Sequence, residues 1–362
     1  MVSSTQSHFT FTLPLTMTKP SILTLFCMLL LASHQAYACD FSALQDVDCD
    51  VMWEPWKAIF DKSYATEEEE TYRFEVFCSS WDRIKEHNTN PEHGWTMDMN
   101  HFADLTPDEW KARHASGFHV FNQLPSYGEH TFQYDDFEGP LPASVNWVAQ
   151  GRITAVKNQG QCGSCWSFST TGAVEGHVAI VNNAAPVSLS EQELVDCSDS
   201  YGDHGCDGGM MDFGFEYVQK NGGLCSETAY PYEAKQGKCQ ASSCKHVSPI
   251  KGYSNVQPRD QAALMAAVAK GPVSIAIEAD QSAFQFYRSG VMDGSCGRAT
   301  DHGVLVVGYG HDEEQHLDYW LVKNSWGPVW GEQGYIRLAR NATLNDGFGQ
   351  CGILSTPSFP LV

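Results

Sequence analysis

The pattern of hydrophobic and polar positions divides this chain into a helical first part and a strand-rich last part. In residues 67–88, Arg73, Phe77, Ile84 and Asn88 recur at helical spacing, which predicts a long helix. Further segments with an apolar side or strong helix formers predict helices over 165–180, 210–220 and 260–270.

Beyond Pro272 the period changes, and short runs of β-branched and aromatic residues predict strands. These runs cover residues 273–277, 304–309, 319–322 and 335–338. Helices followed by strands favour an α+β protein with two lobes. Ligand clefts commonly lie between such lobes.

Local signals mark two helix starts and one linker. Thr106 and Glu109 form a capping-box pattern around Pro107, and Ser190 and Glu193 repeat the box without the proline. Residues 116–142 lack periodicity and contain several Gly and Pro residues, so they are interpreted as a linker.

The N-terminus carries a secretory pattern. Lys19 precedes an apolar run at 22–31, and Ala36-Tyr37-Ala38 fits a cleavage site, so residues 1–38 are interpreted as a signal peptide. Translation could begin at Met17, just ahead of Lys19. The alternative, a membrane anchor, is disfavoured because the run is short for a bilayer.

Charge excludes two classes of partner. The formal net charge of −22 at pH 7 disfavours nucleic-acid phosphate and anionic lipid. Residues 39–139 hold 22 Asp and Glu against 7 Lys and Arg, whereas residues 140–362 hold 22 against 14. Residues 39–139 therefore differ in charge composition from the part that follows, and we call them the acidic segment.

The cysteine count points to disulfides and one free thiol. Of 13 cysteines, Cys27 lies in the signal, and Cys39, Cys49 and Cys78 lie in the acidic segment without an assigned role. The remaining nine are Cys162, Cys165, Cys197, Cys206, Cys225, Cys239, Cys244, Cys296 and Cys351. Secretion favours disulfides, and an odd number leaves one thiol, although the count does not say which.

The segment Cys162-Gly163-Ser164-Cys165 is open to two interpretations from its residues. It could be a redox pair or half of a metal site. Alternatively, Cys165 is a nucleophile at a helix N-terminus, where the helix field favours a thiolate. A nucleophile needs a base. His177 would lie about 18 Å away along the same helix, whereas His302 opens a predicted strand.

Three separated motifs resemble those of the papain-like cysteine peptidases. They are Cys162-Gly163-Ser164-Cys165-Trp166, Asp301-His302-Gly303 and Lys323-Asn324-Ser325-Trp326-Gly327. His302 and Asn324 follow Cys165 by 137 and 159 residues, in the family's order. The resemblance implies a two-lobed α+β fold, with a mainly helical left lobe and an antiparallel, barrel-like right lobe. It also implies a helical inhibitory propeptide at 39–139 and a peptidase domain at 140–362.

The resemblance implies a role for each residue of the expected site. Cys165 attacks the scissile carbonyl as a thiolate, and His302 forms the ion pair and protonates the leaving amine. Asn324 orients the imidazole, and Trp326 shields that bond from water. Gln159 donates to the oxyanion beside the backbone N–H of Cys165. Neither a metal nor a cofactor is expected.

Substrate contacts are also implied by the resemblance. Gly208 and Gly209 present backbone to an extended peptide. A pocket for the second residue before the cleaved bond is expected to lack an acid at its base. Its expected lining residues are Met210, Met211, Ala276, Thr300 and Thr356. An apolar or aromatic side chain is expected there. The full set of expected contacts is Gly163, Ser164, Gly208, Gly209, Met210, Met211, Ala276, Thr300, Asp301, Trp326 and Thr356.

The resemblance further implies the disulfides and a zymogen. The bridges are Cys162–Cys206, Cys197–Cys239 and Cys296–Cys351, with Cys225–Cys244 as a fourth that departs from the basic pattern. Cys165 is then the odd thiol. In the propeptide motifs, Ser80 stands where Asn is usual and Asp98 where Gly is usual. Protonation of carboxylates in an acidic compartment is expected to loosen this segment.

The sequence therefore predicts a monomeric cysteine endopeptidase of the cathepsin L-like branch, made as a proenzyme. Its expected partners are peptide and protein substrates, its own propeptide and inhibitors of the cystatin type. The expected destination is the lysosome, the vacuole or the outside of the cell. Asn341 opens a glycosylation sequon. The alternatives are an inactive relative that binds or stores, an exopeptidase, and acyl transfer to an amine.

Overall fold

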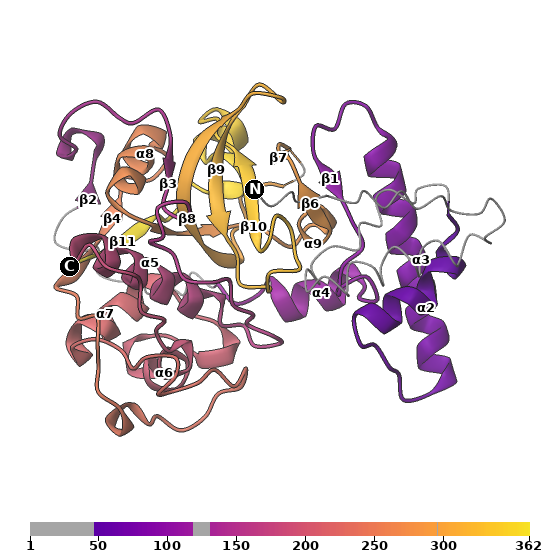
Figure 1. Cartoon of the computed structure of the whole chain (residues 1–362), viewed down its shortest axis with the longest axis horizontal. Helices are drawn as coiled ribbons and strands as arrows, with labels where there is room; N and C mark the ends of the chain where they lie inside the picture. The colour runs from indigo at the N-terminus through magenta and orange to yellow at the C-terminus, as the bar shows by residue number, and fades with distance from the viewer. Residues whose placement is uncertain (1–46, 119–130, 295) are drawn as a thin grey trace, which may run out of the picture.

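The computed structural model describes residues 47–118, 131–294 and 296–362. The predicted signal peptide, Met17 and Cys39 lie outside these ranges. Figure 1 shows the helices of the acidic segment at one end of the molecule, next to a body built of helices and one large sheet. Within the described ranges, no helix combines the length and apolarity needed to cross a membrane.

The acidic segment folds as a helical unit around stacked aromatic rings. Helix α3, Glu67–Thr89, confirms the predicted long helix. It crosses α2, Cys49–Ile59, where Trp53 and Trp56 pack on Phe77 with ring centroids 5.1 and 5.0 Å away. A disulfide joins Cys49 to Cys78 and staples the two helices together. The sequence prediction lacks α2, in which Pro55 interrupts the helical pattern.

Two short elements attach this unit to the body. Strand β1, Thr96–Met97, pairs antiparallel with β6, Tyr287–Ser289. Helix α4, Pro107–His114, starts with the predicted capping box, in which Thr106 and Glu109 each accept from the other's backbone N–H. In Figure 1, α4 lies between the crossed helices and the body.

Three helices pack together in the helical lobe. They are α5, Cys165–Val181, α6, Glu191–Cys197, and α7, Met211–Asn221. Helix α7 ends at Gly222, whose φ of 74° suits glycine. Only half of the box predicted at α6 forms. Ser190 caps the N–H of Glu193, but the Glu193 carboxylate turns away to Tyr217, Asn221 and the N–H of Cys225.

The other lobe is a mostly antiparallel sheet of nine strands among the described residues, in the order β2-β4-β11-β5-β8-β9-β10-β7, with β3 paired to β8. The strands are β2 Thr131–Phe132, β3 Val145–Asn146, β4 Gly252–Val256, β5 Val273–Ile277, β7 Val291–Met292, β8 His302–Asp312, β9 Leu317–Lys323, β10 Tyr335–Ala339 and β11 Ser358–Leu361. Helices α8, Gln261–Lys270, and α9, Ser282–Gln285, accompany it.

The four predicted strands are present, and the long central β8 starts at His302. The expected linker is in part structured, because β2 adds in parallel to β4. A strand of two residues is too short to leave a periodic signal in the sequence. Short 3-10 turns lie at Tyr134–Asp136, Asp199–Tyr201, Gly205–Asp207, Ala241–Ser243, Leu344–Gly347 and Gln350–Gly352.

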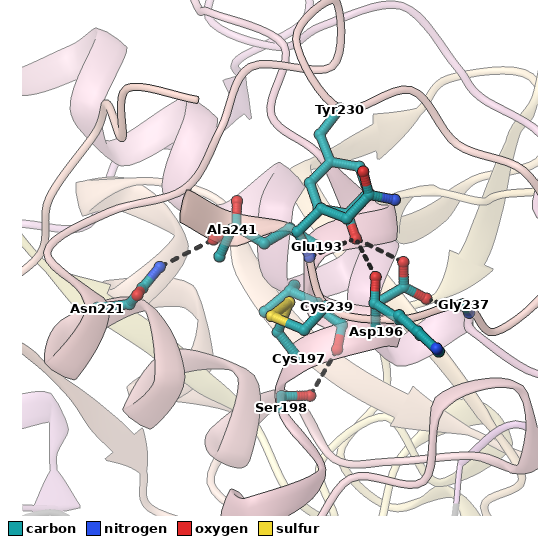
Figure 2. Close-up of a disulfide and its surroundings, with 12 residues drawn as sticks. Glu193, Asp196, Cys197, Ser198, Asn221, Tyr230, Gly237, Cys239 and Ala241 are labelled. Carbon is teal, nitrogen blue, oxygen red and sulfur yellow. Dashed lines mark hydrogen bonds between the residues drawn. A yellow bond between two sulfur atoms is a disulfide. The ribbon is translucent and has the colours of Figure 1, made fainter. Parts of the chain in front are cut away.

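Four disulfides in the body match the pairings that the resemblance implies, including Cys225–Cys244. Figure 2 shows the Cys197–Cys239 bridge at the end of α6. Beside it, Asp196 accepts from the Tyr230 hydroxyl at 2.6 Å and from the Gly237 N–H at 2.6 Å. The bridge and this carboxylate together hold the long loop that follows Tyr230 against the helical lobe.

Candidate active site

Cys165 is the only free cysteine among the described residues, and it is buried at the start of α5. Its Sγ accepts a hydrogen bond from the backbone N–H of Gly303 at 3.2 Å. This contact places the start of strand β8 against the helix. Cys162 is bound to Cys206. The redox-pair interpretation of the Cys162–Cys165 segment is therefore wrong, because only one of its two sulfurs is free.

The strand order brings His302 and Asn324 together, since β8 and β9 are neighbours in the sheet. Nε2–H of His302 donates to Oδ1 of Asn324 at 2.8 Å. The Ser325 N–H donates to the same oxygen at 2.8 Å, so the amide is held with its oxygen toward the imidazole. Trp326 stacks on the His302 ring at 4.6 Å between centroids and covers this bond.

Gln159 is buried next to the loop that carries Cys165. Its Nε2 donates to the carbonyl of Cys162 at 3.1 Å, and its Oε1 accepts from the Ser325 hydroxyl at 2.6 Å. The amide orientation is thus fixed at both ends. Ser325 was not among the expected site residues, although it stands inside the Asn324 motif.

Burial sets the charge state of the expected pair in this structure. It raises the pKa of the Cys165 thiol to about 12 and lowers the pKa of His302 to about 4. In this closed form, burial therefore favours the neutral thiol and imidazole over the thiolate and imidazolium. The field of a helix N-terminus contributes about 1 kcal/mol, less than the cost of removing water from a charged group.

The covering element is the stretch at Gly117 and Phe118, shortly after α4. A Cβ on Gly117 would lie 2.6 Å from the Gly163 carbonyl oxygen and 2.9 Å from Sγ of Cys165, so only glycine fits there. The Gly209 N–H donates to the Gly117 carbonyl at 3.1 Å, and the Phe118 N–H donates to the Asp301 carbonyl at 3.0 Å. The chain thus crosses the thiol and pairs with Gly209 in parallel strand fashion.

Phe118, which belongs to the same buried cluster as Cys165, lines a cavity of about 50 Å³. The lining residues are Phe118, Met210, Met211, Asp212, Asn255, Val256, Pro258, Ser355, Thr356 and Pro357. Met210, Met211 and Thr356 were expected there. Ala276 lies in the same buried cluster as Phe118, and Thr300 packs against Gly352 instead of lining the cavity.

One acid, Asp212, lies in the wall of this cavity and was not among the expected lining residues. Its carboxylate accepts from Asn255 Nδ2 at 2.7 Å, and burial raises its pKa. Gly117 and Phe118 were also missed, since the sequence pattern there indicated only a linker. A glycine followed by an aromatic residue shortly after a capped helix was the available signal.

Comparison with known proteins agrees with this arrangement. The family described as "Papain family cysteine protease" matches residues 141–361, and "Cathepsin propeptide inhibitor domain (I29)" matches residues 53–110.

Individual proteins match over most of their length. The chain is 41% identical over 345 residues to "Probable cysteine protease RDL2" of Arabidopsis thaliana, covering 94% of this chain and 93% of that protein. It is 41% identical to "KDEL-tailed cysteine endopeptidase CEP2" of Arabidopsis thaliana, covering 95% of each.

Among solved structures, digestive procathepsin L 3 of Tenebrio molitor matches with a TM-score of 0.76 at 41% identity. The match covers 87% of this chain and 99% of that one. This chain therefore belongs to the papain family of cysteine proteases and is a proenzyme with a cathepsin-type propeptide.

Proposed function

We propose that this proenzyme gives rise to an endopeptidase in which Cys165 is the nucleophile and His302 the base. One observation carries the proposal: the odd thiol lies against the N–H of Gly303, while the neighbouring His302 is oriented by Asn324 at 2.8 Å. Nδ1 of His302 has no hydrogen-bond partner among the described residues, so it is free to take a proton.

The reaction follows from these positions. When the propeptide leaves, water and the facing charge stabilise a thiolate and an imidazolium, and the proton of Cys165 moves to Nδ1 of His302. The sulfur attacks the scissile carbonyl, and Gln159 Nε2–H and the Cys165 N–H stabilise the oxyanion. His302 returns its proton to the leaving amine, and water then hydrolyses the thioester.

Zymogen activation at acidic pH is the second part of the proposal. Burial lowers the pKa of His101 to about 3 and that of His114 to about 4, and it also lowers the pKa of His87. In a released propeptide these groups return to about 6.5. The released form therefore binds more protons, and it gains on the closed form as pH falls from about 6.5 toward 4.

Carboxylates extend the same trend to lower pH. Glu109 accepts from Arg73 at 2.7 Å, and this pairing lowers the Glu109 pKa below its ordinary value of about 4.3. Its stabilising contribution is complete above that value and is lost as pH falls through the lowered pKa. As pH falls, protonation of the histidines thus begins to favour the open zymogen first. At that pH the carboxylates proposed from sequence are still ionised and still stabilise the closed form.

The proposed specificity rests on the residues that line the cavity. Phe118 supports a preference for apolar or aromatic side chains two residues before the cleaved bond, with Gly208 and Gly209 pairing to the substrate backbone. Asp212 does not reverse this preference, because Asn255 engages its carboxylate and its raised pKa disfavours a free charge.

The protein is proposed to act as a monomer in the secretory pathway, in a lysosome, a vacuole or outside the cell. Five disulfides among the described residues support passage through an oxidising compartment. Asn341 is exposed, as a glycosylation site must be. Inhibitors of the cystatin type would compete for the same cleft.

The deciding experiment acidifies the purified proform and a Cys165→Ala control. Peptides blocked at both ends, with Leu, Phe or Arg at the second position, are then assayed. Internal cleavage by the wild type alone, faster for Phe and Leu than for Arg, is expected. No cleavage after propeptide removal would exclude the peptidase, cleavage of only unblocked peptides would indicate an exopeptidase, and transfer to an added amine in preference to water would indicate an acyltransferase.

A further inference from the structure

A cluster of buried charges lies directly behind the active site and is not explained by the chemistry above. It consists of Lys157 from the segment before α5, Glu175 of α5, Glu191 of α6 and Lys323 at the end of β9. The two carboxylate side chains are each 2% exposed. We call these four residues the cross-lobe cluster, because they join the helical lobe to the sheet.

The cross-lobe cluster is connected throughout. Lys157 Nζ donates to both oxygens of Glu191 at 2.7 Å and lies 3.8 Å from Glu175. Lys323 Nζ donates to Oγ1 of Thr154 at 3.0 Å, and that hydroxyl donates to Glu175 at 2.6 Å. Thr154 is therefore the link between the strand lysine and the helix carboxylate.

The cluster brings two lysines together with two buried carboxylates. Burial raises the pKa of Glu191, against the opposing effect of Lys157, and lowers the pKa of Lys323. Glu227 approaches Lys157 at 3.3 Å from the more exposed edge, with 27% of its side chain accessible. None of the charged atoms of the cluster lacks a partner within the part of the chain that the structure describes. Removal of one partner would leave an uncompensated buried charge, which is far more costly than loss of a surface pair.

The cluster is coupled to the expected site through the backbone. Lys323 immediately precedes Asn324. The cluster lines a cavity of about 20 Å³, with room for about one water, together with Gly303, Asn324 and Ser325. Gly303 contacts Cys165, Asn324 orients His302, and Ser325 holds Gln159. A shift of the β9 end would therefore displace the Asn324–His302 and Ser325–Gln159 contacts together.

We propose that Lys323 is a positioning residue that, through Thr154 and Glu175, anchors the end of β9 to α5 and thereby fixes Asn324 and Ser325 for the reaction. The nucleophile comes from the helical lobe and the base from the sheet, so their alignment depends on how the lobes are joined. This inference rests on the proposed function of Cys165 and His302, and it assigns a role to a residue that never touches substrate.

The test uses the full-length proform, activated by acid and titrated with an irreversible thiol reagent, so that rates refer to active sites. Lys323→Met removes the charge and keeps the stem, Lys323→Arg restores a charged donor, and Lys235→Met removes an exposed lysine with a 72% accessible side chain as the matched control. We expect kcat to fall at least tenfold in Lys323→Met with KM within twofold, at least half-recovery in Lys323→Arg, and no change in Lys235→Met.

A second variant covers a failure of Lys323→Met to fold. Thr154→Val removes the linking hydroxyl but keeps every charge, and we expect kcat to fall three- to fivefold. The proposal is overturned if kcat per titrated site stays within 1.5-fold of wild type in the folded variants, even where their melting temperature drops. A wild type that cleaves nothing would instead refute the proposed function.

Discussion

The active site lies between two surfaces of opposite character. On one side, the propeptide packs through aromatic rings: Trp110 and Phe102 meet Trp326 edge-on at 5.3 and 6.0 Å. Six buried polar atoms in this region lack a hydrogen-bond partner among the described residues. They belong to His101, Trp110, His114, His302, Asn324 and Trp326. On the other side, the charges of the cross-lobe cluster are all partnered.

This difference separates a removable contact from a permanent one. Buried polar groups without partners cost about 1–3 kcal/mol each, so the propeptide contact combines strong hydrophobic burial with a built-in penalty. Neutral histidines add a penalty that grows as pH falls. Each charged group of the cross-lobe cluster has a partner, and the cluster therefore suits a role that persists in the mature enzyme.

The largest expected effect concerns Gln159, a residue that remains in the mature enzyme. Gln159→Ala removes the amide donor that Ser325 holds next to Cys165, and kcat should fall about 10²–10³-fold because one oxyanion donor is lost. KM should change little. Kinetics on titrated active sites measure this, with exposed Gln240→Ala as the control. A fall below tenfold would show that the backbone N–H of Cys165 alone suffices.

The next effect concerns the contact between the propeptide and the active site. Trp110→Ala deletes a fully buried ring of the propeptide and should weaken the closed form by about 3 kcal/mol, because core aromatic truncations cost that much. The alkylation rate of Cys165 in the intact proform at neutral pH should rise about 100-fold. Tyr72→Ala, which removes a 46% exposed ring of the same segment, should leave the rate unchanged.

A smaller effect sharpens the role of histidine. His114→Asn removes a group whose pKa burial lowers to about 4, so opening of the proform should take up about one proton fewer between pH 6.5 and 4.5. The pH dependence of Cys165 alkylation in the proform should become correspondingly shallower. Exposed His316→Asn is the control. An unchanged slope would exclude His114 from the trigger and leave His101, His87 and carboxylates such as Glu109.

The catalytic residues and the segment that covers them also differ in how far the sequence predicts them. Cys165, His302 and Asn324 stand in long motifs, and the predicted elements around them are present because helix caps and apolar runs are local signals. The position of Gly117 over the thiol was not predicted, because it depends on the parallel pairing of Phe118 with Gly209, which is 91 residues away in sequence.

The presence of Asp212 in the pocket wall and the pKa of Cys165 were not predicted, for a related reason. Asp212 enters the pocket wall because α7 begins at Met211, and one helical residue more or less changes which side chains face the cavity. The pKa of Cys165 depends on which atoms exclude water from the sulfur. Those atoms come from a segment that the sequence pattern indicated only as a linker.

The central claim is that the propeptide keeps the Cys165–His302 pair neutral and that its removal allows the ion pair. The direct measurement is the pH titration of thiolate ultraviolet absorbance, taken as wild type minus Cys165→Ala, in the proform at pH values where it stays intact and in the mature enzyme. We predict no thiolate in the proform at pH 7, because burial raises the Cys165 pKa to about 12, and a thiolate at pH 7 in the mature enzyme. Equal thiolate absorbance in both forms at pH 7 would contradict the account.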